Sequence, residues 1–504
     1  MNWSGANWTN SASGLTGDNI ISSKDTALIF STTISSSNQD LSDLIINSMS
    51  FQSGSTFMVL SGMPIQFQKN SNGILPSLTN TSESIVYIHN DLVLNDTLTV
   101  QADQSDIADL RMVLHGAISG SGGIVLKPTE YIQIDGVQKT YTGETTIDGG
   151  RVEIYTDGTE LLNGEISYAW ATPAFNINGS SMLVINKFDV GETGSTTSFN
   201  FDSVGGGKMG SADIFNLRGN FAINTNGGSQ NRILKTMNGE FEFKNSATLT
   251  FDVAAGTDPT SDLKIETSII GSAGQIVKSG NGTLELTNAN TYGAGTTVSA
   301  GTLLVSNRSG SATGTGTVTV QSGATLKSAA ATVTGSPGLI TGAVTIESGG
   351  TISPGLSATE TGTLTLSGGL TLNPGSTAIF HLNSDTAGLG YSQIRASGST
   401  LNLDGSNLVV NLGEGYAPAP EDFFQIMSGD PGTSRFAIPT DGFMTSDSLY
   451  YFDVDYSSSV VTLYNFTPVP EPATMMALGV AGLGLFHFVR RRRDGSRPSV
   501  SLAV

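Results

Sequence analysis

The chain has 504 residues, with 23 Lys or Arg against 43 Asp or Glu, which gives a formal net charge of −20. This acidic balance excludes electrostatic nucleic-acid binding, and the absence of cysteine excludes disulfides, thiolate metal sites and cysteine nucleophiles. Only 13% of the residues are charged whereas 62 are glycine, a composition typical of many short strands joined by tight turns.

Short alternating segments in the first part of the chain predict β-strands. Residues 27–30, 84–88 and 98–100 carry apolar side chains at alternate positions, and Ser, Asn, Asp and Gly bound these runs. Patterns typical of helices are almost absent there. We therefore expect an all-β fold and assign residues 1–110 to a β-rich N-terminal region in which a β-solenoid begins.

An internal repeat is the strongest indication of the fold. Residues 139–152 (KTYTGETTIDGGRV) align without a gap on residues 290–303 (NTYGAGTTVSAGTL). Related glycine-rich segments precede the two copies, at 120–125 and 271–277. Copies of one strand-turn-strand unit that lie far apart in a chain indicate a solenoid whose intervening coils have diverged.

Both copies resemble the passenger-associated β-strand repeat of autotransporter-like proteins, in which GxLxKxGxGxLxL is followed by a TYxGxTxI turn and a GxL strand. Residues 274–305 follow this pattern nearly throughout, whereas residues 120–154 carry an insertion between the two halves. The resemblance implies a right-handed parallel β-helix. We place this β-helix at residues 111–390, with strand repeats at 120–154 and 271–305.

After the second copy the repeat continues in a simpler form. Residues 318–326, 344–352 and 364–372 each have the pattern strand, glycine turn, strand. Their Val, Leu and Ile side chains are expected to point inward and stack on the next coil, while Thr and Ser face water. Three glycines are expected to adopt turn conformations that other residues resist: Gly323, Gly349 and Gly368.

Two regions depart from these regular coils. Residues 160–270 are less regular, and six phenylalanines there suggest widened coils with loop excursions: Phe199, Phe201, Phe215, Phe221, Phe241 and Phe243. A binding surface outside the regular coils would be sought there first, although an ordinary packed insertion is the more common case. Residues 391–466 have longer strands and more aromatic residues, which predicts a β-rich C-terminal cap over the open end of the stack.

The last part of the chain begins with a proline-rich motif. Val469, Pro470, Glu471 and Pro472 are expected to stay out of helical conformation, because proline fixes φ and lacks an amide donor. Residues 473–489 carry no charge. As a helix they would span about 26 Å, slightly less than the roughly 30 Å hydrocarbon core of a membrane.

Four arginines follow the apolar segment directly: Arg490, Arg491, Arg492 and Arg493. A basic cluster next to an apolar span stays on the cytoplasmic side of a membrane. We therefore predict a single C-terminal transmembrane helix, with the C-terminus in the cytoplasm and the body of the protein outside.

The order of proline motif, apolar helix and arginine cluster at 467–493 resembles the PEP-CTERM sorting signal of bacterial envelope proteins. The family implies recognition by an exosortase, a membrane-embedded cysteine transpeptidase that cleaves near Pro470, Glu471 and Pro472. The anchor would then be transient, and the body would pass to the cell surface or to an extracellular polymer. A plain membrane anchor is the alternative interpretation, and it also places the body outside.

Export requires a signal peptide, but Met1, Asn2 and Trp3 open the chain with neither a basic nor an apolar segment, and the first lysine is Lys24. We expect the sequence to begin at or near the mature N-terminus, or the true start codon to lie upstream. Trp3 and Trp8 would then open the folded part.

The sequence contains no motif that favours an enzyme. Asp453 and Asp455 share one face of a predicted strand, but paired catalytic carboxylates need a defined separation in a groove. Arg151 near Asp148 and Glu153 lies inside the structural repeat. The four histidines are isolated in sequence and lack metal-ligand spacing: His89, His115, His381 and His487. We predict no catalytic, cofactor-binding or metal-binding residues and no enzymatic activity.

These observations predict an exported, non-enzymatic surface or extracellular-matrix protein that acts in adhesion or associates with exopolysaccharide or a cell-surface glycan. Its other partners would be the exosortase and, before processing, the membrane. The alternative is a polysaccharide lyase or hydrolase on the same scaffold, because β-helices also carry such enzymes. A passive spacer without a ligand is a third possibility.

Overall fold

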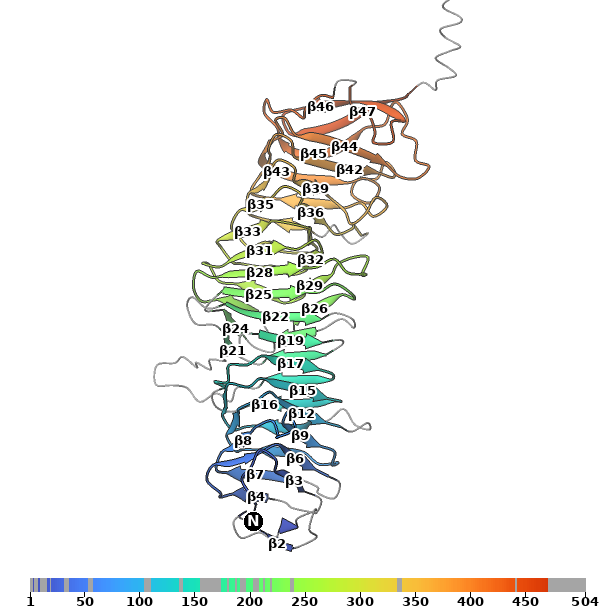
Figure 1. Cartoon of the computed structure of the whole chain (residues 1–504). Helices are drawn as coiled ribbons and strands as arrows, with labels where there is room; N and C mark the ends of the chain where they lie inside the picture. Colours follow the sequence, from blue (N-terminus) through green and yellow to red (C-terminus); the bar gives the residue numbers. More distant parts are fainter. Residues whose placement is uncertain are drawn as a thin grey trace, which may run out of the picture.

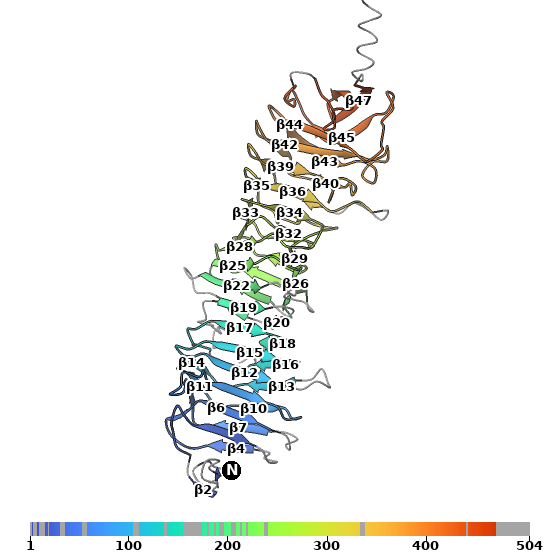
Figure 2. The same cartoon turned by 45° about the vertical axis from the view of Figure 1, so that its right-hand side comes forward.

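The protein forms an elongated stack of coils that runs from the N-terminal to the C-terminal end of the chain (Figure 1, Figure 2). The structure, a computed structural model, describes residues 20–469 with internal gaps, together with residues 3, 8–9 and 16–18. The gaps are residues 31–35, 53–57, 104–109, 136–138, 155–173, 179–180, 186–187, 191–195, 203–207, 212–213, 218–219, 236–239, 333–337 and 440–441. Residues 470–504 lie outside the described part.

The first coils place three strands on three sides of the stack. One coil consists of β3 (Ala27–Phe30), β4 (Ser36–Gln39) and β5 (Leu44–Ile46). The next coil consists of β6 (Ser48–Phe51), β7 (Met58–Gly62) and β8 (Ile65–Phe67). Each strand of the second coil pairs in parallel with its counterpart in the first, so the backbone hydrogen bonds run along the axis of the stack.

The sheet that begins with β3 and β6, here called sheet 1, extends along the whole stack, and its strands pair in parallel from coil to coil. Its other strands are β9 (Ser77–Asn80), β12 (Leu98–Ala102), β15 (Ile124–Pro128), β17 (Thr145–Asp148), β19 (Ala174–Asn178), β22 (Thr196–Asp202), β25 (Asn220–Thr225), β28 (Thr248–Val253), β31 (Gln275–Ser279), β33 (Gly295–Val298), β35 (Val318–Val320), β38 (Val344–Ile346), β41 (Leu370–Leu372) and β43 (Gln393–Asn402).

The sheet that begins with β4 and β7, here called sheet 2, has 16 strands in the described part of the chain and covers a second side of the stack. Its other strands are β10 (Val86–Ile88), β13 (Leu110–Leu114), β16 (Tyr131–Ile134), β18 (Arg151–Ile154), β20 (Met182–Ile185), β23 (Lys208–Ser211), β26 (Asn231–Lys235), β29 (Leu263–Ile265), β32 (Thr283–Leu286), β34 (Thr302–Val305), β36 (Thr325–Ser328), β39 (Thr351–Ser353), β42 (Thr377–Leu382) and β44 (Asn407–Leu412).

The third side is divided into shorter sheets. One sheet contains β5, β8, β11 (Leu92–Leu94) and β14 (Ile118–Gly120), and another contains β21 (Phe188–Val190), β24 (Ile214–Leu217), β27 (Glu240–Phe243) and β30 (Ser268–Ile270). Nearer the C-terminal end, β37 (Leu339–Ile340) and β40 (Thr363–Leu366) pair in parallel with each other, and β40 pairs with β43.

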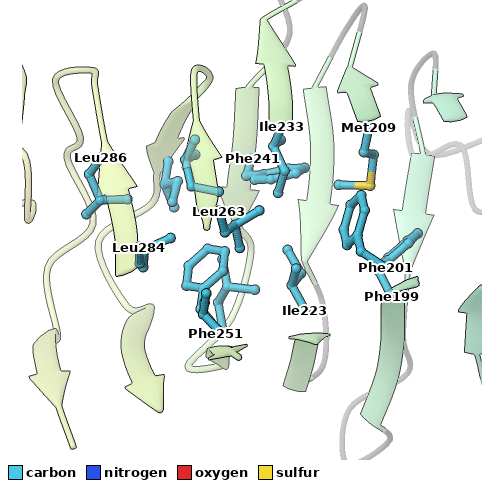
Figure 3. Packing of buried hydrophobic residues seen from close by; sticks show 14 of the residues in the cluster. Phe199, Phe201, Met209, Ile223, Ile233, Phe241, Phe251, Leu263, Leu284 and Leu286 are labelled. Atoms are coloured by element: carbon cyan, nitrogen blue, oxygen red, sulfur yellow. The ribbon is translucent and has the colours of Figure 1, made fainter. Parts of the chain in front are cut away.

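Alternation of side chains explains why these segments stack. In β35, β38 and β41 the inward residues Val318, Val344 and Leu370 occupy one register position, and each is at most 2% exposed. Figure 3 shows the same arrangement lower in the stack, where Phe201 of sheet 1 packs beside Met209 of sheet 2. Burial of one such side chain is worth about 1.5–3 kcal/mol, so the core is stabilised coil by coil.

The described phenylalanine side chains of the less regular region belong to this core. Phe199, Phe201, Phe241 and Phe243 are all at most 4% exposed, and the rings of Phe175 and Phe199 stack with centroids 4.9 Å apart. The side chains of the other two predicted residues, Phe215 and Phe221, lie outside the described part. The described phenylalanines therefore fill the interior and do not line a surface.

Turn glycines fall into two kinds. Gly323 and Gly349 have φ of 78°, as predicted for left-handed turn positions. Gly368 was expected to behave likewise, but the positive φ of 90° belongs to Gly369. Gly368 is needed for close approach, because an added Cβ would lie 2.4 Å from the carbonyl carbon of Gly342 in the coil below.

Aromatic side chains cover both ends of the core. At the N-terminal end, Trp3 is 1% exposed and its ring lies 5.9 Å from that of Phe30, near the antiparallel pair β1 (Trp8–Thr9) and β2 (Thr16–Asp18). At the other end, β45 (Phe424–Asp430), β46 (Tyr450–Tyr456) and β47 (Val460–Pro468) form an antiparallel cover. Phe466 packs edge-on against Phe424 there.

The all-β prediction is confirmed, and the parallel strands in stacked sheets are consistent with a β-helical solenoid. No α-helix occurs among the described residues. The transmembrane helix predicted at 473–489 lies outside them. The predicted domain boundaries at residues 110, 390 and 466 stay predictions.

Candidate functional site

The sorting segment begins at the end of the last strand. Pro468, the last residue of β47, pairs with Tyr450 of β46, and the amide of Val469 donates to the carbonyl of Leu449 at 2.8 Å. Val469 is therefore still hydrogen-bonded to the cap. The other predicted sorting residues lie outside the described part: Pro470, Glu471, Pro472, Arg490, Arg491, Arg492 and Arg493.

Between residues 3 and 469, gaps excepted, no helix has the length and apolarity needed to cross a membrane.

The two repeat copies build the same internal corner. The hydroxyl of Tyr141 lies 2.5 Å from Oγ1 of Thr145, and the hydroxyl of Tyr292 lies 2.6 Å from Oγ1 of Thr296. All four residues are buried, and burial raises the pKa of both tyrosines well above its usual value. The tyrosine and the threonine of the TYxGxTxI pattern are thus a buried hydrogen-bonded pair.

Each copy has a glycine at this corner that the neighbouring coil requires, but at different positions: the pattern glycine is Gly143 in the first copy, whereas the second copy has Ala294 there and Gly293 directly before it. A Cβ added at Gly143 would lie 2.3 Å from the amide nitrogen of Gly123, and one added at Gly293 would lie 2.3 Å from the carbonyl oxygen of Ser272. Both separations are far shorter than a van der Waals contact. The repeat motif is therefore a packing motif.

Two buried lysines bind backbone carbonyls near these corners. Nζ of Lys139 donates to the carbonyls of Gly116 and Asp135 at 2.7 and 2.9 Å, and Nζ of Lys278 donates to three turn carbonyls, the shortest at 2.6 Å. Burial lowers the pKa of each lysine to about 8, and nearby aspartates oppose this shift. These ammonium groups stabilise turns and do not face a ligand.

The richest cluster of functional side chains lies on the outward face of sheet 2, on or directly after β10, β13, β16 and β18. We call it the ring network. Its members are Tyr87, His89, His115, Tyr131, Gln133, Asp135, Arg151 and Glu153.

One half of the ring network is a series of stacked rings. The rings of Tyr87 and His89 are nearly parallel at 16°, with centroids 6.4 Å apart. The ring of His89 lies 4.7 Å from that of His115 in the next coil, and Nδ1 of His115 lies 2.7 Å from Oδ1 of Asp135. Burial, followed by the proximity of His115, lowers the pKa of His89, and Asp135 opposes this effect.

The other half of the network is polar and internally hydrogen-bonded. Nε2 of Gln133 donates to Asp135 at 3.0 Å, and the hydroxyl of Tyr131 donates to Glu153 at 2.6 Å. Arg151 donates to the same carboxylate at 3.1 Å, while its guanidinium carbon lies 5.2 Å from the centre of the Tyr131 ring. Burial and the bond to Glu153 raise the pKa of Tyr131.

The ring network corrects the interpretation of the histidines. His89 and His115 are not isolated, because the coils bring their rings into contact. His381 is buried apart from them, where its Nδ1 lies 3.3 Å from Nδ2 of Asn411, and His487 lies outside the described residues. Within the described ranges, no three His, Cys, Asp or Glu side chains are placed to hold a metal ion.

The pairing of successive coils, and not a fixed spacing in the sequence, brings these two histidines together. Ile88 pairs directly with Leu114, and the histidines are the residues that follow them. Metal-ligand motifs use shorter spacings, so a search for those motifs passes over residues that lie one coil apart.

The predicted acidic candidates have ordinary environments. Asp453 accepts a hydrogen bond from Asn465 at 2.7 Å on the exposed face of β46, which it shares with Asp455. Asp148 does not contribute to an arginine site, because it pairs with Lys127 at 3.0 Å.

Two family models match the chain. The passenger-associated-transport-repeat model matches residues 135–154 and 276–305, and the PEP-CTERM protein-sorting motif model matches residues 468–493. No curated protein matches the chain. Both resemblances drawn from the sequence are thus confirmed. The sorting motif implies that this chain, whose solenoid carries both repeats, is an exported cell-envelope protein processed by an exosortase.

Proposed function

We propose that the chain is a non-enzymatic surface or extracellular-matrix protein that associates with exopolysaccharide or a cell-surface glycan. The observation that carries this proposal is the sorting motif at 468–493, which follows the end of the cap at Pro468. Everything described before the motif would then lie on the exported side.

In this proposal residues 473–489 form a transient single-pass helix and Arg490, Arg491, Arg492 and Arg493 remain in the cytoplasm. The exosortase recognises Pro470, Glu471 and Pro472 and releases the body to the cell surface or the matrix. The body is a right-handed β-helix, as the repeats imply.

The outward surface of the solenoid supports an association with sugars. On sheet 1, Nδ2 of Asn200 donates to Asn176 at 2.7 Å, and Nδ2 of Asn224 donates to Asn200 at 2.8 Å, so amides align along the stack. On sheet 2, threonines of five successive coils share one register position: Thr283, Thr302, Thr325, Thr351 and Thr377. Amides and hydroxyls both donate and accept hydrogen bonds, as sugar hydroxyls do.

A polysaccharide lyase or hydrolase is the second candidate, and the pair of His115 and Asp135 favours it. An aspartate that binds one nitrogen of a histidine orients the ring for proton transfer at the other nitrogen. Hydrolysis of a glycosidic bond would also require an acid and a base on opposite sides of the bond. Asp135 and Glu153 are instead held by hydrogen bonds within the network, which favours the non-enzymatic proposal.

The processed protein, purified from its own cells, would be mixed with exopolysaccharide from those cells and analysed by size-exclusion chromatography with light scattering. Co-elution with polymer of unchanged mass supports the proposal. A fall in polymer mass would establish the enzyme, and separate elution of two unchanged components would favour a spacer.

A further inference from the structure

We propose that the ring network is a binding site for a neutral, hydroxyl-rich segment of polysaccharide. This inference rests on the proposed function and names the place on the solenoid where the sugar binds.

The side chains of the ring network are not needed to build the solenoid. Further along the same sheet, outward positions are filled by the threonine series from Thr283 to Thr377, which suits β-structure without any further role. The network replaces such residues with four aromatic or imidazole rings and three ionisable groups. All of these side chains point away from the core, so coil packing does not account for them.

The stacked rings offer apolar faces of the size of a sugar ring. Tyr87, His89 and His115 form a continuous series across two coils, and the His115 side chain is 42% exposed. Rings that keep one polar edge can bury the C–H face of a pyranose and still hydrogen-bond to its hydroxyls. Four coils at about 4.8 Å each make the site long enough for a few sugar units.

The polar half provides both donors and acceptors. Arg151 presents a guanidinium that is 47% exposed. Because Nδ1 of His115 lies against Asp135, Nε2 is the ring nitrogen that remains for a hydrogen bond to a ligand. The internal hydrogen bonds of Asp135 and Glu153 hold these groups in place before binding, which lowers the entropic cost of ordering them.

Charge selects a neutral ligand over an acidic one. The network contains two carboxylates, those of Asp135 and Glu153, against one exposed cation, Arg151; Lys139 lies beside Asp135 but is only 3% exposed and is held by backbone carbonyls. The whole chain carries a net charge of −20. The carboxylates of the network and the negative charge of the whole chain would both repel a uronate-rich polymer, whereas the hydroxyls of a neutral sugar can donate to the carboxylates.

The test uses the processed protein released by its own cells and two probes, the neutral and the acidic fractions of exopolysaccharide from those cells, separated by anion exchange. Binding is measured by affinity electrophoresis. Tyr87→Ala and His115→Ala should each weaken binding of the neutral fraction at least tenfold. Tyr87→Phe keeps the ring and loses only the hydroxyl, so it should retain most of the binding that Tyr87→Ala loses. Tyr464→Ala, an exposed tyrosine on the cap, is the matched control and should also bind normally.

The possible outcomes distinguish a wrong binding site from a wrong proposed function. If the wild type binds the neutral fraction and both alanine variants bind equally well, the site is wrong and the proposed function stands. If the wild type binds only the acidic fraction, the ligand class is wrong. If it binds neither fraction, the proposed function fails, and this inference fails with it. Circular dichroism of each variant verifies the fold, and Arg151→Thr provides a second variant should either alanine variant fail to fold.

Discussion

The two repeat copies share their interior and differ at their surface. Tyr141 and Tyr292 make the same buried bond to a threonine four residues on. At the outward positions, however, the first copy has Arg151 and Glu153 of the ring network, where the second copy has Thr302 and Leu304, which is covered and only 2% exposed. Coil packing constrains the inward residues, whereas the outward residues are less constrained and can differ between the copies. Chemistry that is specific to the outward face of one copy therefore marks a candidate site.

The interior itself differs at one informative position. Ile124 pairs with Thr145, and Ile276 pairs with the equivalent Thr296, so Lys278 occupies the inward position that Leu126 fills in the first copy. A lysine is accommodated there because its ammonium reaches three turn carbonyls. The solenoid therefore tolerates a buried charge where backbone acceptors lie within reach.

The largest effect is expected from the shared tyrosine. Tyr141→Ala and Tyr292→Ala each remove a fully buried ring and should lower the free energy of unfolding by about 3–5 kcal/mol. Urea denaturation followed by circular dichroism measures this loss. Tyr141→Phe and Tyr292→Phe, which remove only a hydrogen bond, should cost about 1 kcal/mol. A small loss in one alanine variant alone would show that the two corners are not equivalent.

The corner glycines, Gly143 in the first copy and Gly293 in the second, should give the next largest effect. Gly143→Ala and Gly293→Ala each force a methyl group against backbone of the coil below and should cost about 1–3 kcal/mol. Hydrogen exchange of the amides in β15 and β31 would localise the damage to the affected corner. Ala294→Ser, a change at the exposed residue that takes the place of Gly143 in the second copy, serves as the control and should leave exchange unchanged.

The buried Lys278 of the second copy makes stability depend on pH, in addition to the similar contribution of Lys139 in the first copy. The pKa of Lys278 is about 8 in the folded chain and about 10.5 in an unfolded one. Between these values the unfolded chain binds more protons, so stability should rise as the pH increases from 8 to 10. Lys278→Leu, which installs the residue of the first copy, should remove that contribution. The prediction fails if wild type and variant differ by the same amount in urea denaturation at pH 7 and at pH 10.

Much of the fold could be predicted because the sequence patterns that determine it lie within short segments of the chain. Alternating Val, Leu and Ile set the inward face, and the repeated TYxGxTxI pattern identifies a corner that recurs. The ring network could not be predicted in the same way, because it depends on register between coils of unequal length. The coil from Ile88 to Leu114 is longer than the coil from Leu114 to Ile134, so no constant spacing relates His89, His115 and Asp135.

The smallest change in stability should come from exchanging the outward residues of the two copies. Arg151→Thr removes an exposed ion pair and a cation–π contact, each worth at most about 1 kcal/mol, so the unfolding midpoint should move little. Binding of the neutral polysaccharide should nevertheless weaken several-fold, because Arg151 is the exposed donor of the ring network. The reverse change, Thr302→Arg, should alter neither stability nor binding, because the second copy lacks the stacked rings. If Arg151→Thr instead destabilised the coil as strongly as the loss of Tyr141, the outward face would be part of the structural repeat, and the difference between the copies would carry no information about function.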